Sequence, residues 1–357
     1  MIARTLVAMA TITIACAAIS CDGGDDALST ASATHTSTPA PTPTPKPAVT
    51  TLLFTGDIIP ARCTYARLEA IGDYTAPFHA LRDILTSADI TAGTLDTTIS
   101  TVARPIGCTP TFNLASPARV VEGLLYAGFD VVAHAANHIK DCGAVNCGDR
   151  AMFETLWLLR SAGIAPVGSG GDVMEARRPA VIERNGVRFA FLAYDDIAPY
   201  YHAGPQTAGS APLDASTLAA DVAAARDVAD VVIVVPHWGV EYVATPTERQ
   251  RALARVAAIA GADLVVGNHP HWAQAHEQIG ETFVAYALGN FVFDQDWSAE
   301  TQQGAMLEVT FEGDAMAGYR YIPVRIHDEY QPRLAAPAEA EEIMRRIESA
   351  SAALTAP

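Results

Sequence analysis

Several apolar segments of this 357-residue chain end in a side chain that can bind a metal ion or transfer a proton. Each segment has the length of a strand, and each is followed at once by Asp, Asn or His rather than by the Gly and Ser of an ordinary loop. The residues at these ends are Asp57, Asp96, Asn137 with His138, His237, and His269 with His271. Carboxylate, amide and imidazole groups together form the ligand set that Mn²⁺, Fe²⁺ or Zn²⁺ accepts.

The placement of these residues favours a shared site over separate structural roles. Taken singly, Asp57 after a glycine could cap a turn and Asn137 could hold a loop. In open α/β sheets, however, the carboxyl ends of the strands lie along one edge, so these side chains are expected to converge on one crevice. His269 and His271 are alternate residues, which project to the same side of an extended segment.

The elements that must position these residues alternate between short apolar runs and amphipathic patterns, which indicates an α/β fold with strands buried on both faces. Strands are expected at 51–55, 90–95, 129–134, 231–235 and 264–267, and helices at 76–87, 117–128, 150–163, 216–229 and 247–261. Asn185-Gly186 predicts a hairpin that joins strands 180–183 and 187–193. Further strands are expected at 282–287, 305–311 and 318–325, followed by a surface helix or tail at 335–357.

Composition limits the class of protein. Half of the residues are hydrophobic, which is enough for a large core, and one domain is expected over residues 50–330. The formal net charge is −17, so the Lys and Arg surface that neutralises nucleic-acid phosphates is missing and no nucleic-acid partner is expected.

The N-terminus has the pattern of an export signal. Residues 1–20 contain Arg4 followed by an apolar run of signal-peptide length. Small residues precede Cys21, and this arrangement resembles a bacterial lipoprotein signal in which Cys21 carries the lipid; ordinary signal cleavage is the alternative. Residues 22–49 are rich in Ser, Thr and Pro and are expected to be a tether. We therefore expect an exported protein anchored by lipid to the outer face of the cell membrane.

Four cysteines remain in the exported part if Cys21 carries lipid. An even number in an oxidising compartment favours two disulfides, with Cys142 and Cys147 close enough in sequence to close one loop. Cys63 and Cys108 are left as the second pair. A zinc cluster is the alternative, although the chain has no Cys-x-x-Cys spacing to support it.

The ordered motifs resemble the CapA, or poly-γ-glutamate capsule-synthesis, family from about residue 51 to residue 325. They are Gly56-Asp57 with Arg62, Leu95-Asp96, Asn137-His138 with Asp141 and Gly143, His237-Trp238-Gly239, Gly267-Asn-His269-Pro-His271, and Leu288-Gly-Asn-Phe-Val-Phe-Asp294. The same order is similar to calcineurin-like metallophosphoesterases. The resemblance implies their four-layer α/β/β/α sandwich.

The resemblance also implies roles for single residues. Asp57, Asp96, Asn137, His237, His269 and His271 match ligands of one or two divalent ions, and Asp96 matches the carboxylate that bridges them. His138 matches a general acid, and Arg62 is a candidate for substrate binding. Two positions depart from the pattern: Ile59 stands where these phosphoesterases carry a ligand His, and Asp96 stands where CapA-like proteins carry Glu.

Three functions follow from this resemblance. The first is a metalloprotein in the synthesis, export or trimming of an anionic surface polymer, with poly-γ-glutamate as the polymer that the family implies. The second is a hydrolase for a phosphate-containing small molecule. The third is a binding module that keeps the fold without catalysis, which Ile59 favours.

Overall fold

The chain divides into two units, residues 1–45 and 46–357. The computed structural model of the protein describes residues 47–355, which lie within the second unit. The predicted signal peptide, Cys21 and nearly all of the predicted tether lie outside the described residues. Val49, the last residue of that predicted tether, already belongs to the first strand. None of the helices in residues 47–355 has the length and apolarity needed to cross a membrane.

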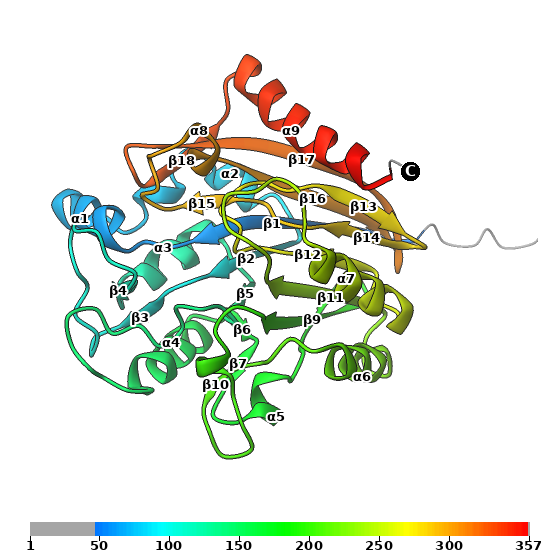
Figure 1. The fold of residues 1–357 in the computed structure, drawn as a ribbon, viewed down its shortest axis with the longest axis horizontal. Coiled ribbons are helices and arrows are strands. Elements are labelled where there is room, and N and C mark those ends of the chain that lie inside the picture. The colour runs from blue at the N-terminus through cyan, green and yellow to red at the C-terminus, as the bar shows by residue number, and fades with distance from the viewer. Residues whose placement is uncertain (1–46, 356–357) are drawn as a thin grey trace, which may run out of the picture. The chain divides into compact units, whose positions relative to one another are not determined.

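The first sheet has eight strands built around β1 (Figure 1). Its order is β18 (Gln331–Leu334), β17 (Ala315–His327), β16 (Gln303–Glu312), β1 (Val49–Ile58), β2 (Ile90–Leu95), β5 (Val131–Ala133) and β6 (Ala165–Val167), and β15 (Asn290–Val292) also pairs with β1. Strands β1, β2, β5 and β6 run parallel, so their carboxyl ends lie at one edge.

The second sheet has six strands and a parallel centre. Its order is β13 (His276–Ile279), β14 (Thr282–Ala285), β12 (Leu264–Val266), β11 (Val231–His237), β9 (Val187–Asp195) and β8 (Ala180–Arg184). The predicted hairpin is confirmed: β8 and β9 pair antiparallel, and both turn residues, Asn185 and Gly186, have positive φ. Two small sheets pair β3 (Thr98–Ser100) with β4 (Ala115–Pro117), and β7 (Ser169–Gly170) with β10 (Gly209–Ser210).

The layers follow from the alternation of buried side chains. Leu52 and Phe54 of β1 point into a core shared by both sheets, together with Phe189 and Phe191 of β9. Leu53 points the other way, to a second core under α1 (Arg62–Ile71), α2 (Arg82–Leu85), α3 (Val120–Ala127) and α4 (Arg150–Ser161). A third core lies between the second sheet and α6 (Ala215–Arg226) and α7 (Glu248–Ala260). The predicted four-layer α/β/β/α sandwich is therefore confirmed.

The remaining helices are peripheral. They are η1 (Ala76–Phe78), α5 (Val173–Ala176), η2 (Pro199–Tyr201), α8 (Ala299–Gln302) and α9 (Pro337–Thr355). The long helix α9 buries Ile343 and Ile347 against Ala273 and Ala305, so the predicted C-terminal surface helix has a packed face.

Most predicted elements are present with small shifts of their ends. The helix expected over 76–87 is split into η1 and α2, because buried Phe78, Leu81 and Leu85 reach the core from two short turns. Helix α1 was not predicted from the sequence. Its only buried residues are Thr64 and Leu68, which give a weak amphipathic signal.

Candidate metal centre

Each sheet of the sandwich supplies one half of a polar cluster at the carboxyl ends of its strands. The first sheet supplies the oxygen donors: Asp57 lies near the end of β1, Asp96 directly follows β2, and Asn137 lies in the loop after β5. The second sheet supplies the imidazoles: His237 ends β11, and His269 and His271 follow β12. The structure thus brings together all six residues predicted as metal ligands.

Three imidazole–carboxylate distances within this cluster are longer than hydrogen bonds. His237 Nδ1 lies 3.9 Å from Asp57 Oδ1, and His237 Nε2 lies 3.7 Å from Asp96 Oδ2. His271 Nδ1 lies 3.6 Å from Asp57 Oδ2. Two ligands on opposite sides of one ion are separated by up to about 4.2 Å, twice a typical metal–ligand bond. All three distances are too long for direct hydrogen bonds. His237 Nδ1 and Asp57 are close enough to share an ion, whereas His237 Nε2 lies 2.8 Å from Asn137 Oδ1, a hydrogen-bond distance.

Four buried atoms of the cluster make no hydrogen bond within the described chain. They are Asp57 Oδ1, Asp96 Oδ2, His237 Nδ1 and His269 Nδ1. A buried carboxylate oxygen without a partner costs free energy, because the water it loses on folding is not replaced. Two oxygens and two imidazole nitrogens in one place are suitable ligands for a divalent cation. The residues present therefore fit a metal ion.

The pKa values of two of the three imidazoles agree with this fit, whereas at His271 burial is outweighed by the Asp57 carboxylate, which raises the pKa. Burial lowers the pKa of His237 well below its usual value, and the neighbouring His269 and His271 lower it further. Burial also lowers the pKa of His269. Both rings therefore stay neutral at physiological pH, which is the state that binds metals. Burial raises the pKa of Asp96 to about 7, so this carboxyl group charges readily only when a cation compensates it.

The backbone is strained where the second sheet presents its histidines. His269 has a φ of 99° and His271 a φ of 58°, in the left-handed region that residues with a side chain rarely adopt. The fold holds two such residues around Pro270 at the point where the His271 ring and the His269 backbone amide approach Asp57. Strain of this kind is concentrated at functional sites.

Asn290 fixes the orientation of His271. Its amide nitrogen donates to Gln295 Oε1 and to Thr301 O, so its Oδ1 must accept a hydrogen bond. His271 Nδ1 lies 2.9 Å from that oxygen and therefore carries the proton, which leaves the lone pair of the neutral ring on Nε2. This role of Asn290 was not predicted from the sequence. Gly56 allows the approach of β15, since a Cβ there would lie 1.9 Å from Gly289 O.

His138 lies beside the cluster and is held by two carboxylates. Its backbone amide donates to Asp96 Oδ1 at 3.3 Å, and its Nδ1 lies 2.6 Å from Asp141 Oδ2. Burial opposes the protonation of His138, but the charges of Asp96 and Asp141 outweigh it and raise its pKa. The ring is thus set up to hold a proton on Nδ1 and to present Nε2.

Ile59, at the position where phosphoesterases carry a histidine, is an apolar core residue. It is fully buried and packs with Ala61, Leu114 and Phe293. No seventh ligand is provided from this position.

Arg62 and His271 both contact the ring of Phe293. Its guanidinium pairs with Asp294, donates to Thr111 O at 3.1 Å and stacks on the ring of Phe293. Substrate binding by Arg62 stays a prediction, since these contacts engage most of its donors. Tyr242 stacks on His271 and lines the site. Trp238 is a core residue.

Both predicted disulfides are confirmed. Cys142 pairs with Cys147 in the loop after His138, and Cys63 pairs with Cys108. Glu329 approaches the second pair, but the two thiols are oxidised and are not metal ligands. The alternative of a cysteine-based zinc cluster is therefore wrong.

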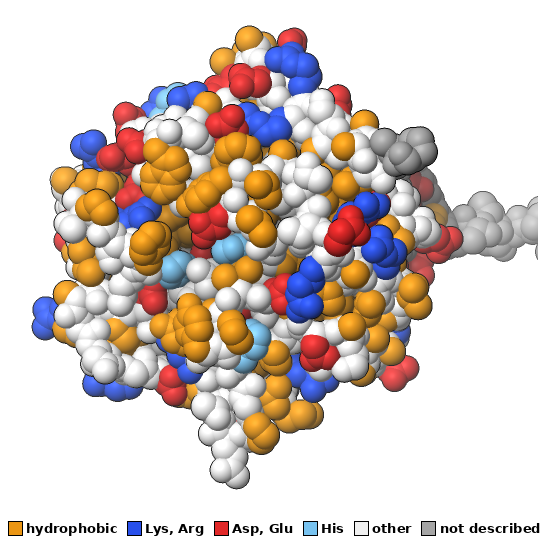
Figure 2. All heavy atoms as spheres, viewed as in Figure 1, with side chains coloured by type: hydrophobic (Ala, Val, Ile, Leu, Met, Phe, Trp, Pro, Cys, Tyr) orange, Lys and Arg blue, Asp and Glu red, His pale blue; other side chains and the backbone are white. Residues whose placement is uncertain are grey.

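Histidine side chains and carboxylates are visible near the middle of one face of the domain, with hydrophobic side chains around them (Figure 2).

Comparison with known proteins gives one clear relationship. The family described as "Bacterial capsule synthesis protein PGA_cap" matches residues 51–295. The chain is 30% identical over 282 residues to the PGA biosynthesis protein CapA of Bacillus subtilis (strain 168), which covers 78% of this chain and 72% of that protein. It is 32% identical over 221 residues to the capsule biosynthesis protein CapA of Bacillus anthracis, covering 60% of this chain and 52% of that protein.

Solved structures support the fold. A Staphylococcus aureus structure designated a 5′-nucleotidase superimposes with a TM-score of 0.50 at 12% identity, over 85% of this chain and 58% of that one. At this identity the likeness extends to the architecture only.

Proposed function

Because this chain belongs to the bacterial capsule synthesis protein family PGA_cap, we propose that it is a cell-surface metalloprotein in the synthesis, export or trimming of a poly-γ-glutamate type polymer. The observation that carries the proposal is the set of four buried, unpartnered atoms on Asp57, Asp96, His237 and His269. A structural cluster would have satisfied these atoms with hydrogen bonds.

The proposed ligands are Asp57, Asp96, Asn137, His237, His269 and His271, which would hold one or two ions of Mn, Fe or Zn. A bound divalent ion would supply Lewis acidity toward a carbonyl or phosphoryl oxygen. The protein's own contribution is geometric. The burial of His237 and His269 keeps their rings neutral, and Asn290 sets the tautomer of His271.

Proton transfer is assigned to His138. Burial opposes protonation of His138, but Asp96 and Asp141 raise its pKa, and Asp141 holds Nδ1, which leaves Nε2 as the donor. This arrangement suits donation to a leaving group on a substrate that lies over the cluster.

The test uses the gene in its own host. Deletion is expected to lower the amount of surface polymer, wild-type protein to restore it, and His269→Ala to fail although it is produced at wild-type level. Full restoration by His269→Ala would contradict a role for the metal centre. Metal analysis of the purified full chain should then find at least one ion in wild-type protein and fewer in the variant.

Hydrolysis of a phosphate ester is the second candidate, and the His138–Asp141 pair beside the cluster favours it. Turnover of a chromogenic phosphate monoester that depends on Mn²⁺ or Zn²⁺ and on His138 would support this activity. If deletion of the gene abolishes the surface polymer and the protein shows no such turnover, a role in polymer synthesis, export or trimming is favoured instead.

A binding module without catalysis is the third candidate, supported by the apolar Ile59 in a ligand position. Wild-type protein that contains no metal and takes up none would favour it.

Attachment to the outer face of the membrane through a lipid on Cys21 is part of the proposal. It rests on the signal pattern and on the Pro-rich segment that follows. Cys21→Ala should move the protein out of the membrane fraction. Unchanged membrane association of that variant would contradict the lipid anchor.

A further inference from the structure

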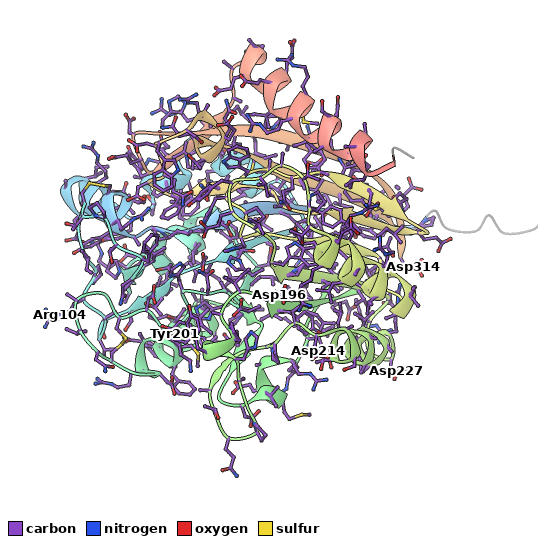
Figure 3. The ribbon with its side chains drawn as sticks, viewed as in Figure 1. Arg104, Asp196, Tyr201, Asp214, Asp227 and Asp314 are labelled. Atoms are coloured by element: carbon purple, nitrogen blue, oxygen red, sulfur yellow. A yellow bond between two sulfur atoms is a disulfide. The ribbon has the colours of Figure 1, made fainter. Side chains whose placement is uncertain are left out.

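A pocket of about 490 Å³ is lined in part by the segment that follows His138, and its volume is in the range of small-molecule sites. Three segments form its walls. The loop before β4 supplies Asn113, the loop closed by the Cys142–Cys147 disulfide supplies Lys140, Asn146 and Asp149, and η2 supplies Tyr200 and Tyr201. Tyr201 and Arg104 are labelled in Figure 3, and the backbone of Arg104 is hydrogen-bonded to Cys142, although Arg104 is not among the lining residues. We call this space the amide pocket.

The segment that follows His138, the proposed proton donor, lines the pocket. Asp141 turns inward and contacts His138 Nδ1, while its neighbours Lys140 and Cys142 line the pocket. Asp141 also accepts a hydrogen bond from the backbone of Leu114, the residue after Asn113. The pocket therefore borders the segment whose Asp141 holds His138 Nδ1.

The charges of the pocket cancel. Lys140 Nζ lies 2.9 Å from an oxygen of Asp149 and donates to Ala208 O at 2.6 Å. No other charged side chain is among the residues that line the pocket. With no free cation, the pocket is poorly suited to select a carboxylate or a phosphate, and the net charge of −17 adds no attraction for a polyanion.

The two amide side chains leave donors available for a ligand. Asn113 Oδ1 accepts a hydrogen bond from Gly143 N, and Asn146 Oδ1 accepts one from Gly148 N. Because each Oδ1 already accepts a hydrogen bond, the NH₂ group of each side chain is the group left to donate to a ligand. Such groups recognise carbonyl oxygens.

Two tyrosine rings complete the pocket. Tyr200 and Tyr201 meet edge to face with their centroids 4.7 Å apart, and Tyr200 is 74% exposed. An exposed ring beside amide donors offers a flat surface and hydrogen bonds together, which suits a planar, uncharged amide group.

We infer that the amide pocket is a substrate subsite that binds the amide backbone of an amide-linked chain and positions the next linkage beside His138. The inference rests on the proposed function and adds a specificity to it. The pocket binds the neutral amide linkages of the polymer and does not bind its carboxylates.

The test is calorimetric titration of the full-length protein with a hexamer of γ-linked glutamate and with its neutral methyl ester. Both are expected to bind, with little change between low and high salt. Tyr200→Ala should lower the affinity for both the hexamer and its ester by about threefold to tenfold, which is the effect of losing one aromatic contact. Trp157→Ala is the matched control, because Trp157 is an exposed aromatic residue on α4 that does not line the pocket.

Several outcomes would overturn the inference. They are equal affinity of Tyr200→Ala and wild type, binding of the free acid but not of the ester, or Tyr200-dependent binding of a neutral oligosaccharide in place of the hexamer. Failure of the proposed function is distinguishable. If wild type binds the hexamer through Tyr200 but holds no metal and has no turnover, the metal proposal fails and the pocket stands. If turnover requires His269 but Tyr200→Ala leaves KM unchanged, the pocket fails.

Discussion

The backbone amide of His269 donates a hydrogen bond to Asp57 Oδ2 at 3.3 Å, although the two residues are 212 positions apart and come from different sheets. The oxygen half of the cluster therefore meets the imidazole half only when the two sheets have packed. The geometry of the metal centre depends on the sandwich core. Metal binding therefore tests both the ligand residues and the packing of the two sheets.

Removal of a single ligand should lower metal content. Asp57→Asn and His269→Ala each delete or weaken a donor, and elemental analysis of the purified variants should show at least one ion fewer than in wild type. His276→Ala is the control, because His276 lies on β13 and is not in the cluster. Equal metal content in all four proteins would contradict the assignment.

The contact between Asn290 and His271 should matter for affinity rather than for ligand number. Asn290→Ala removes the oxygen that fixes the tautomer of His271, and metal affinity should fall by about 10-fold to 100-fold. Competition with a fluorescent chelator measures this. If the affinity of Asn290→Ala equals that of wild type, the hydrogen bond does not orient the ring.

His138 should affect turnover and not metal binding. His138→Ala is expected to keep its metal and to lose about 10²-fold to 10⁴-fold in turnover. As an acid, His138 works below its pKa, so activity should fall as pH rises through that value. Asp141→Asn removes a charge that raises this pKa and should move the fall to lower pH. Metal loss in His138→Ala equal to that in His269→Ala would identify it as a ligand instead.

Metal-free protein should lose stability as pH rises. Asp96 has a pKa of about 7 in the folded state, above the ordinary Asp value of 3.8 expected in the unfolded chain, so between these values only the folded state holds the proton. The free energy of unfolding then decreases by up to about 1.4 kcal/mol per pH unit in that window. Urea titrations of chelator-treated protein at several pH values test this. Asp96→Asn should flatten the dependence, and an unchanged slope in this variant would assign the effect to other groups.

The disulfide after His138 should contribute a modest stability. Closing so short a loop lowers the entropy of the unfolded chain by an amount worth about 2 kcal/mol. The Cys142→Ala, Cys147→Ala double variant should therefore unfold at lower urea concentration. Stability equal to that of wild type would mean that the loop is already held by the contacts between Arg104 and residues 142–144.

Much of the site was predictable because its residues end buried strands. Strand β2 has the predicted bounds, and Asp96 follows it directly. The converging edge then brings Asp57, Asn137 and His237 together, as the parallel arrangement requires. These positions were predictable because the length of a strand and the polar residue that follows it can both be recognised in a short stretch of sequence.

What could not be predicted depends on contacts between distant segments. Asn290 reaches His271 because β15 packs beside β1 over Gly56, and nothing near Asn290 in the sequence indicates this. Tyr242 stacks on His271 from a loop, and neither the pairing of Arg62 with Asp294 nor the amide pocket follows from a local pattern. Periodicity describes the faces of single elements and does not describe which loops meet above them.

The position of β1 has a mechanical consequence. The strand begins at Val49, the third described residue, and it is hydrogen-bonded to β16 on one side and to β2 on the other. A pull on the chain upstream of Pro47 would act along the axis of this strand and load its hydrogen bonds in shear, all at once. Asp57 lies eight residues further on, about 26 Å along an extended strand, so tension would enter at the end remote from the cluster. The metal site should therefore stay intact under a pulling force that would be sufficient to detach an edge strand one hydrogen bond at a time.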